Sequence, residues 1–558
     1  MHRHERAARL VAIAIVVWLA AIASVVRRVA IASVVRRVGI AIVAATAVAV
    51  CATVRTGTAD AAAAGGPPSA VSAVAIPPGQ IDRAVASLDR LANDLMRRSG
   101  VPGMAIAVVH DDTVVYSKGF GVREVGTNKR VDRNTIFQLA SVSKPLGATV
   151  VAGAVGRGTV QWSDPVAKYL PGFTLSDPYV GTHVTIADMY AHRSGLPGQA
   201  GDLLEDLGYD RTAIIARLAL EPLDPFRTVY HYANFGLTAG GEAVAKAAGT
   251  TWEDLSQDVL YGPLGMTSTS SRFSDYRKAL NRALLHVRVG SRWLARYTRE
   301  PDAQSPAGGA SSSVRDMAQW LRLELANGKY NGKQIIDEAA LLQTRVPHIA
   351  TGPPATPISR TSFYGLGMGV EYDAAGRLRL SHAGAFAVGA STAIAMLPSE
   401  KLGIVVLTNG MPVGVSESLT SEFLDLAEFG KVQRDWFADL SKVFAAMLAN
   451  QGMLANKTPP ANPAPAQPPA AYAGSYANAF YGPASIVSKD GRLVMVLGPR
   501  NVEFPLTHWD GNTFSYVPVG EDASGLQAVT FTIGADGRAA TFVVENFNTD
   551  KLGTFTRT

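Results

Sequence analysis

The sequence predicts a large α/β domain followed by a small all-β module. Two strand patterns at 103–121 and three β segments at 376–409 flank a helix-rich stretch, roughly 185–330. A Pro/Ala-rich segment, 456–470, then predicts a semi-rigid, extended linker. Short strand patterns joined by Asp-Gly turns follow it. These observations separate an α/β domain from a β module made of short strands and tight turns.

The composition fits a folded chain with more than one domain and a neutral body. The chain has 558 residues, of which 47% are hydrophobic and 18% charged. The net charge of +6 comes from residues 1–60, which hold eight arginines and two acidic residues, so the remainder holds 44 basic and 44 acidic residues. A neutral body without a basic run argues against nucleic-acid binding.

The N-terminal segment, 1–61, predicts a signal peptide or an N-terminal membrane anchor. Uncharged apolar runs at 10–26 and 38–54 each follow arginines, and "ADA" at 59–61 is a candidate cleavage site. We therefore expect an exported bacterial protein that is periplasmic, secreted or membrane-anchored. Cys51 is the single cysteine, which excludes an internal disulfide and a cysteine-based zinc site.

The α/β domain is predicted to cover 80–435. A small-residue and proline linker, 62–79, precedes a helix at 81–98, which stops at Gly100. Two strands then meet at the polar triplet His110-Asp111-Asp112.

The later elements follow the same kinds of signal. Residues 141–156 predict a buried helix, and the last two β segments of 376–409 turn at Pro398–Glu400. A helix and the Pro/Ala linker fill 436–470, and a β-barrel-like module fills 471–558. Its Asp-Gly turns lie at 490–491, 510–511 and 536–537.

The first candidate for chemistry is the Ser-x-x-Lys pair Ser141 and Lys144. On a helix these positions share a face, and burial lowers a lysine's pKa toward the range of a general base. A serine hydroxyl needs such a base to become a nucleophile. If Ser141 caps the helix, Pro145 lies among the first four N–H positions, and the helix start suits an oxyanion. One such pair is expected by chance, so the motif alone is weak.

A second candidate is Tyr232-Ala-Asn234, which leads into a Gly/Ala-rich helix. A phenol beside a lysine is expected to titrate low enough to share proton transfer. The Asn234 amide can bind near Ser141 or to a substrate carbonyl. A second Tyr-Ala-Asn, at 476–478, lies in the β module, and we interpret it as structural.

A third candidate is His382-Ala-Gly384, which we place at the end of a predicted strand. The glycine allows close backbone approach. The histidine could donate to a substrate carboxylate or influence the tyrosine, although a lone histidine is more often structural.

The three motifs, in this order, resemble the serine β-lactamase and penicillin-binding protein superfamily, in particular its class C-like branch. The resemblance covers roughly 80–430. It extends to four further segments, namely "VTIADMYAHRSGLPG" at 184–198, "YGPLGMTSTS" at 261–270, "PAGGASSSVRDMAQWL" at 306–321 and "YGLGMGV" at 364–370.

The resemblance implies a fold, a set of residue roles and no metal or cofactor. The fold is an antiparallel sheet flanked by helices, with a helical subdomain. Ser141 would be the acylated nucleophile, and Lys144 and Tyr232 would move protons. Asn234 would bind the substrate's amide or carbonyl. The N–H groups of Ser141 and Ala385 would form the oxyanion hole.

The third motif departs from the Lys-Thr-Gly of this branch's β-lactamases. Histidine is mostly neutral at pH 7, so His382 does not supply the permanent cation that helps hold a β-lactam carboxylate. Relatives with histidine here resemble peptidases, amidases and esterases. The strand near 382–390, with Gly384, would hold a peptide-like substrate by backbone pairing. The module segment 472–498 resembles lipocalin-like modules fused to such hydrolases and could shape the cleft.

The predicted function is an exported serine hydrolase that forms an acyl-enzyme on Ser141. Its substrate would be a small-molecule or peptide-like ester or amide, as for an esterase, a D-amino-acid peptidase or a weak β-lactamase. The N-terminal segment would provide any membrane association. The alternative is a penicillin-binding sensor that acylates with little turnover. A nucleophile-elbow hydrolase is disfavoured because "GASTA" at 389–393 lacks the final glycine, and no metallohydrolase motif occurs.

Overall fold

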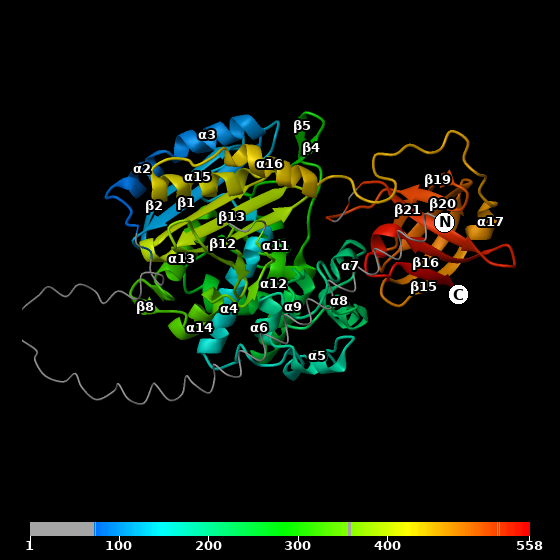
Figure 1. Ribbon diagram of the computed structural model, residues 1–558, viewed down its shortest axis with the longest axis horizontal. Coiled ribbons are helices and arrows are strands. Elements are labelled where there is room, and N and C mark those ends of the chain that lie inside the picture. The colour runs from blue at the N-terminus through cyan, green and yellow to red at the C-terminus, as the bar shows by residue number, and fades with distance from the viewer. Residues whose placement is uncertain (1–71, 73, 355, 357–358, 522, 524) are drawn as a thin grey trace, which may run out of the picture. The chain divides into compact units, whose positions relative to one another are not determined.

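The computed structural model describes residues 72, 74–354, 356, 359–521, 523 and 525–558 (Figure 1). They belong to one compact unit, Pro67–Thr558. The predicted signal peptide or anchor, 1–61, lies outside the described residues. Within the described ranges, no helix has both the length and the apolar character needed to cross a membrane.

The first domain is built on an eight-stranded sheet in which all neighbouring strands are antiparallel. The strand order is β2-β1-β14-β13-β12-β11-β10-β9. The strands are β1 Gly103–His110, β2 Thr113–Gly121, β9 Ile349–Ala350, β10 Phe363–Tyr364, β11 Gly369–Tyr372, β12 Leu378–Phe386, β13 Ala390–Leu397 and β14 Leu402–Thr408. The predicted strands at 103–121 and 376–409, and the turn at Pro398–Glu400, are confirmed.

One face of the sheet packs against helices α2 (Gln80–Ala86), α3 (Leu88–Ser99) and α15 (Val415–Phe429) (Figure 1). Alternate residues of β1 point to this face, among them Met104, Ile106 and Val108. The predicted single helix at 81–98 is two helices that meet at Ser87, whose N–H donates to the Ala84 carbonyl. Helix α16 (Trp436–Met447) packs beside α15.

The other face of the sheet packs against a larger helical region, where α4 (Ser143–Gly156) and α13 (Val314–Leu325) are central. Every residue of α4 from Ser143 to Ala154 is buried, which fits a sequence that is apolar or small except for Ser143, Lys144 and Thr149. The remaining helices are α5 Pro178–His183, α6 Ile186–Tyr190, α7 Asp202–Asp206, α8 Arg211–Arg217, α9 Asn234–Ala247, α10 Trp252–Ser256, α11 Phe273–Lys278, α12 Ser305–Gly308 and α14 Glu338–Leu342.

Three two-stranded ribbons complete this domain, and the first of them anchors the start of α4. They are β3 Phe137–Gln138 with β6 Ser311–Ser312, β4 Val287–Val289 with β5 Arg292–Leu294, and β7 Lys329–Tyr330 with β8 Lys333–Gln334.

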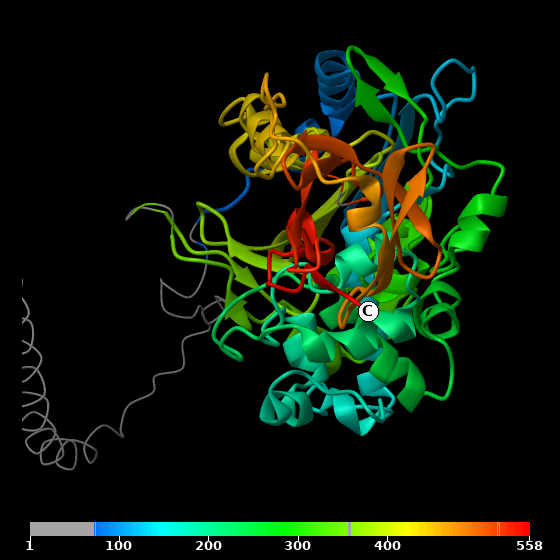
Figure 2. The same ribbon diagram turned by 90° about the vertical axis from the view of Figure 1, so that its right-hand side faces the viewer.

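The C-terminal module is a nine-stranded antiparallel sheet that follows the short helix α17 (Pro469–Tyr472). Its order is β18-β17-β16-β15-β23-β22-β21-β20-β19. The strands are β15 Gly474–Asn478, β16 Gly482–Lys489, β17 Arg492–Leu497, β18 Val502–Pro505, β19 Thr507–Asp510, β20 Thr513–Tyr516, β21 Gln527–Ile533, β22 Ala539–Val544 and β23 Thr554–Arg557. Figure 2 shows the curved sheet in the orange to red part of the chain.

The module is a nearly closed barrel because its two edge strands are neighbours in sequence. Only Leu506 separates β18 from β19, so the sheet must curl until its edges approach one another. At the turn between β16 and β17, Asp490 and Gly491 both have positive φ, 50° and 76°, as a tight hairpin requires. The predicted fold class, an α/β domain with an antiparallel sheet followed by a small all-β module, is confirmed.

Two of the hydrogen bonds between the module and the helical region are donated to backbone carbonyls of the module. The Tyr209 hydroxyl donates to the Tyr481 carbonyl at 2.9 Å, and Arg217 Nε donates to the Phe480 carbonyl at 2.9 Å. Both acceptors lie in the turn between β15 and β16, and both donors lie near α8. These bonds place the barrel against the domain that carries the candidate site.

We expect Arg345→Ala to lower the free energy of unfolding by about 3–5 kcal/mol, because it leaves a buried carboxylate unpaired. Arg345 Nη2 lies 2.9 Å from Glu324 Oε2, and the two side chains are 6% and 0% exposed. Arg379→Ala is the matched control, since its pair with Glu371 is 31% and 33% exposed and should cost about 1 kcal/mol or less. Urea unfolding followed by circular dichroism measures both, and equal losses would contradict the prediction.

Candidate active site

The candidate nucleophile, Ser141, lies in a single 3-10 turn, Ala140–Val142, directly before α4. The prediction that Ser141 caps the helix is wrong by one residue, because the helix begins at Ser143 and Val142 precedes it. Ala140 has a φ of 47°, a conformation that costs energy for any residue other than glycine. The turn is held because Leu139 donates its N–H to the Ala310 carbonyl and accepts a hydrogen bond from Thr392 Oγ1 at 2.7 Å.

Lys144 is fully buried beneath this turn. Its Nζ lies within hydrogen-bond distance of three oxygens, at 3.0 Å from Ser141 Oγ, 2.7 Å from Asn234 Oδ1 and 3.0 Å from the Ala307 carbonyl. Burial lowers the pKa of Lys144 to about 7, and the negative charge of Asp202 opposes this shift. When Lys144 is neutral, two N–H groups satisfy Asn234 and Ala307, which leaves the lone pair for the Ser141 hydroxyl.

Tyr232 lies against this pair, with Lys144 Nζ 4.4 Å from the centre of its ring. The expectation that the lysine makes the phenol titrate low is wrong. Burial raises the pKa of Tyr232 well above its usual value, and its hydrogen bond with Ser141 opposes the shift only in part. Tyr232 is therefore a neutral phenol at pH 7, able to donate a hydrogen bond to Ser141 or to a leaving group.

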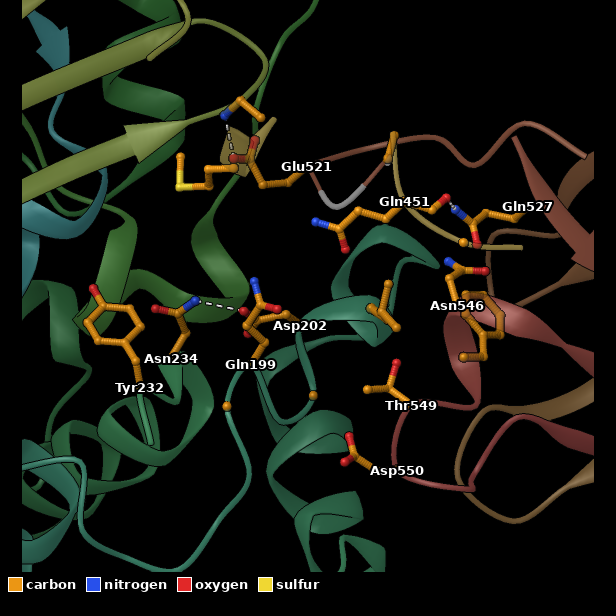
Figure 3. A pocket seen from close by; sticks show the side chains of 18 of the residues that line it. Gln199, Asp202, Tyr232, Asn234, Gln451, Glu521, Gln527, Asn546, Thr549 and Asp550 are labelled. Atoms are coloured by element: carbon orange, nitrogen blue, oxygen red, sulfur yellow. Dashed lines mark hydrogen bonds between the residues drawn. The ribbon is translucent and has the colours of Figure 1, made fainter. Parts of the chain in front are cut away.

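Asn234 begins α9 and is oriented by a residue that sequence reasoning missed, Asp202 of α7. Asn234 Nδ2 donates to Asp202 Oδ2 at 2.8 Å (Figure 3). The Asn234 Oδ1 accepts from Lys144. Because a carboxylate can only accept and an ammonium only donate, these contacts fix which way the amide points. An acidic residue early in a short helix carries no sequence signal that would separate Asp202 from an ordinary surface acid.

His382 lies in the middle of β12, not at the end of a strand as predicted. Its Nδ1 is 2.7 Å from the Ala383 carbonyl, so Nδ1 carries the proton, and Nε2 accepts from the Tyr364 hydroxyl at 2.8 Å. Burial, with the nearby Lys144 charge, lowers the pKa of His382 to about 3. The ring is neutral at pH 7, as predicted, and both nitrogens contact protein groups. A direct contact with substrate stays a prediction.

A second histidine, His192, supports the Tyr-x-Asn segment and was also missed. It is buried, and its Nδ1 accepts the Ala233 N–H at 3.2 Å. Its ring centre lies 4.4 Å from that of Tyr232 and 5.0 Å from that of Tyr364. His192 lies within the segment 184–198, where the family resemblance could have drawn attention to it.

Gly384 brings β12 against the nucleophile turn. A Cβ at this position would lie 2.4 Å from the Leu139 carbonyl oxygen and 2.9 Å from the Ser141 nitrogen, so only glycine fits. The backbone of Ala385 follows directly. The Phe386 carbonyl accepts from Gly389 on the β13 side, so the neighbouring Ala385 directs its N–H to the opposite edge. That direction suits the predicted oxyanion role of Ala385.

The nucleophile turn, the start of α9 and the end of β12 border a pocket of about 1050 Å³. Its walls include Ser141, Tyr232, Asn234 and Ala385 from the α/β domain and Glu521 from the barrel module (Figure 3). The structure thus brings together Ser141, Lys144, Tyr232, Asn234, His382, Gly384 and Ala385. In the described part of the chain, no three His, Cys, Asp or Glu side chains are grouped so that they could hold a metal ion.

Family models match both parts of the chain. The family model Beta-lactamase matches residues 88–428, which is more than half of the chain. A second family model, described as a domain of unknown function (DUF3471), matches residues 458–555.

Three curated relatives match over three quarters or more of their own length. Unguisins hydrolase ungD of Aspergillus violaceofuscus is 27% identical over 70% of this chain and 75% of the relative. Penicillin-binding protein 4 of Amycolatopsis lactamdurans is 28% identical over 65% and 90%. The D-alanyl-D-alanine-carboxypeptidase/endopeptidase AmpH of Escherichia coli is 24% identical over 61% and 87%.

Solved structures share the fold. The octameric penicillin-binding protein homologue from Pyrococcus abyssi matches 82% of this chain and 98% of its own, with a TM-score of 0.53 and 18% identity. A class C beta-lactamase from Rhodobacter sphaeroides matches 61% and 98%, with a TM-score of 0.50 and 22% identity.

We expect kcat/KM for p-nitrophenyl acetate to rise with pH and to level off above about 7, because the neutral form of Lys144 accepts the Ser141 proton. Initial rates between pH 5 and 9 measure this rising limb of the pH profile. Lys144→Met should remove the limb and lower the rate about 10²–10⁴-fold. The exposed Lys246 provides the control variant Lys246→Met, which should leave the profile unchanged. A wild-type profile without a limb near 7 would contradict the assignment.

We expect Asp202→Asn to move the midpoint of that limb to lower pH. Loss of the Asp202 charge removes an interaction that raises the Lys144 pKa. The plateau rate should also fall, because the Asn234 amide loses a charged acceptor. Asp258→Asn, at a side chain that is 70% exposed, is the control. A midpoint that moves upward would show that Asp202 does not act on Lys144 in this way.

Proposed function

Because the chain belongs to the beta-lactamase family of serine hydrolases, we propose that it forms an acyl-enzyme on Ser141 and hydrolyses small esters or amide and peptide bonds. The observation that carries this proposal is the Ser141–Lys144 pair, with Oγ and Nζ 3.0 Å apart and a lysine pKa lowered to about 7. Such a pair can ionise the hydroxyl near neutral pH without a metal or cofactor.

Acylation begins when neutral Lys144 takes the Ser141 proton and Oγ attacks the substrate carbonyl carbon. The carbonyl oxygen gains the negative charge, which the Ser141 and Ala385 N–H groups would stabilise. As the tetrahedral intermediate collapses, the bond to the leaving group breaks, and the leaving group takes a proton from Lys144 through the Tyr232 phenol. Asn234 would hold the acyl part through its amide.

Deacylation repeats these steps with water as the nucleophile. Lys144, neutral again, removes a proton from the water as its oxygen attacks the ester carbonyl of the acyl-enzyme. Collapse of the second intermediate breaks the bond to Oγ, which takes the proton back, and the acid product leaves.

The chemistry of the third motif favours esters and amides over efficient β-lactam hydrolysis. His382 is neutral, because burial lowers its pKa to about 3. Arg299 is the one lysine or arginine among the described residues that line the pocket, and it is ion-paired with the buried Glu205. A substrate carboxylate therefore meets little uncompensated positive charge. The Escherichia coli relative, named as a carboxypeptidase/endopeptidase, supports a peptide-like substrate.

We also infer that the protein is exported, as the N-terminal apolar runs and the "ADA" sequence indicate. Its partner would be a small-molecule or peptide-like substrate, and the N-terminal segment would provide any membrane attachment.

We expect Ser141→Ala to abolish labelling by a fluorophosphonate probe and turnover of p-nitrophenyl acetate. Gel fluorescence and the release of p-nitrophenolate measure the two effects. Ser399→Ala, at an exposed serine, is the control and should react like the wild type. Labelling of the Ser141→Ala variant at the wild-type rate would refute the proposed nucleophile. A wild type that is labelled but turns over no ester would favour the sensor alternative.

A further inference from the structure

A carboxylate of the barrel module reaches the substrate-binding strand. Glu521 Oε1 accepts the Ala387 N–H at 2.5 Å (Figure 3). The Glu521 N–H donates to Asp206 Oδ1 at 3.2 Å. Ala387 directly follows β12, two residues beyond Ala385. The barrel therefore places a negative charge in the same pocket as Ser141.

The strand geometry shows which part of a substrate would meet this charge. Ala385 directs its N–H and carbonyl to the edge opposite β13. The N–H of Ala387, in the turn after β12, points to the same edge, because the Phe386 carbonyl of that trans peptide unit points toward β13. In an antiparallel pair, one residue exchanges both hydrogen bonds with its partner. A substrate residue whose scissile carbonyl accepts from the Ala385 N–H would thus donate its own N–H to the Ala385 carbonyl. Its amino side then points along β12 toward Ala387.

Glu521 ends the pairing edge at that point. The next N–H along the edge, that of Ala387, is already bonded to the Glu521 carboxylate. A longer peptide would have to displace this carboxylate to continue pairing. An acyl residue with a free amino group would instead place its ammonium between the Ala385 carbonyl and the Glu521 carboxylate.

The surrounding charges favour a cation. Six acidic residues line the pocket, namely Asp202, Glu221, Glu417, Glu521, Glu545 and Asp550. Arg299 lies near enough for its charge to interact with Glu521, but its guanidinium is hydrogen-bonded to Glu205. Burial raises the pKa of Glu221 and Glu417 to about 7, so these two are only partly ionised at neutral pH. The other four acids still outnumber Arg299 along the described walls, so an ammonium group is attracted.

We propose that Glu521 and the Ala385 carbonyl bind the free α-ammonium group of the acyl residue. The enzyme would then release single N-terminal residues from peptides, or hydrolyse esters and amides of unblocked amino acids. This assignment of substrate class rests on the proposed serine hydrolase function. The barrel module would thereby set specificity, while the α/β domain carries the chemistry.

Glycine benzyl ester and N-acetylglycine benzyl ester test the proposal, because they share a leaving group and neither is chiral. We expect the wild-type enzyme to have at least a tenfold higher kcat/KM for glycine benzyl ester, measured as benzyl alcohol by chromatography. Acetylation removes the positive charge and extends the acyl part into Glu521.

Glu521→Gln should reduce kcat/KM for glycine benzyl ester about 10- to 100-fold, the usual weight of a hydrogen bond to a charged group. The glutamine can still accept the Ala387 N–H, so the loop stays anchored, and the loss on the acetylated ester should be at least fivefold smaller than the loss on glycine benzyl ester. Glu503→Gln, at an exposed residue of the same module, is the control for loss of one charge.

Two outcomes would overturn the proposal. One is a wild-type preference for the acetylated ester, or turnover of p-nitrophenyl acetate with neither benzyl ester hydrolysed. The other is an equal loss on both benzyl esters in Glu521→Gln, which would show a purely structural role. Failure of the proposed function would be separate, because Ser141 would then not be labelled by a fluorophosphonate and p-nitrophenyl acetate would not be hydrolysed.

Discussion

The burial of Lys144 is the constraint on which the rest of the site depends. A lysine with no exposed surface needs partners for its donors, and the nucleophile turn, α9 and α12 each supply one oxygen. Each partner is in turn held by others, Ser141 by the strained turn after Ala140 and Asn234 by Asp202. The three oxygens lie on different segments, so the fold must place these segments together for all three hydrogen bonds to Lys144 to form.

Much of the fold could be predicted because its signals are local. The apolar strands at 103–121 and 376–409, the Pro/Ala linker and the Asp-Gly turns each depend on a short run of residues. The order of the Ser-x-x-Lys, Tyr-x-Asn and His-x-Gly motifs then indicated which residues meet. The errors are local too: a break at Ser87, a helix predicted from 141 that begins at Ser143, and a histidine inside a strand.

Contacts between distant segments could not be predicted in the same way. Asp202 and Glu521 are ordinary acids in the sequence, and they acquire a role only because packing brings them to Asn234 and to the end of β12. The high pKa of Tyr232 has the same origin, since desolvation depends on how completely the fold covers the ring. The neutral state of His382 could be expected from its ordinary pKa, but its bonds to Tyr364 and Ala383 could not.

The buried lysine also couples folding to proton binding. In the unfolded chain Lys144 keeps its proton up to a pKa of about 10.5, whereas the folded protein releases it near 7. Between these values the unfolded state binds more protons, so raising the pH favours the folded state. The difference in pKa corresponds to roughly 5 kcal/mol, at one unit per about 1.4 kcal/mol. At neutral pH the molecule therefore forgoes stability comparable to that of a whole small domain in order to keep one amine ready to accept a proton.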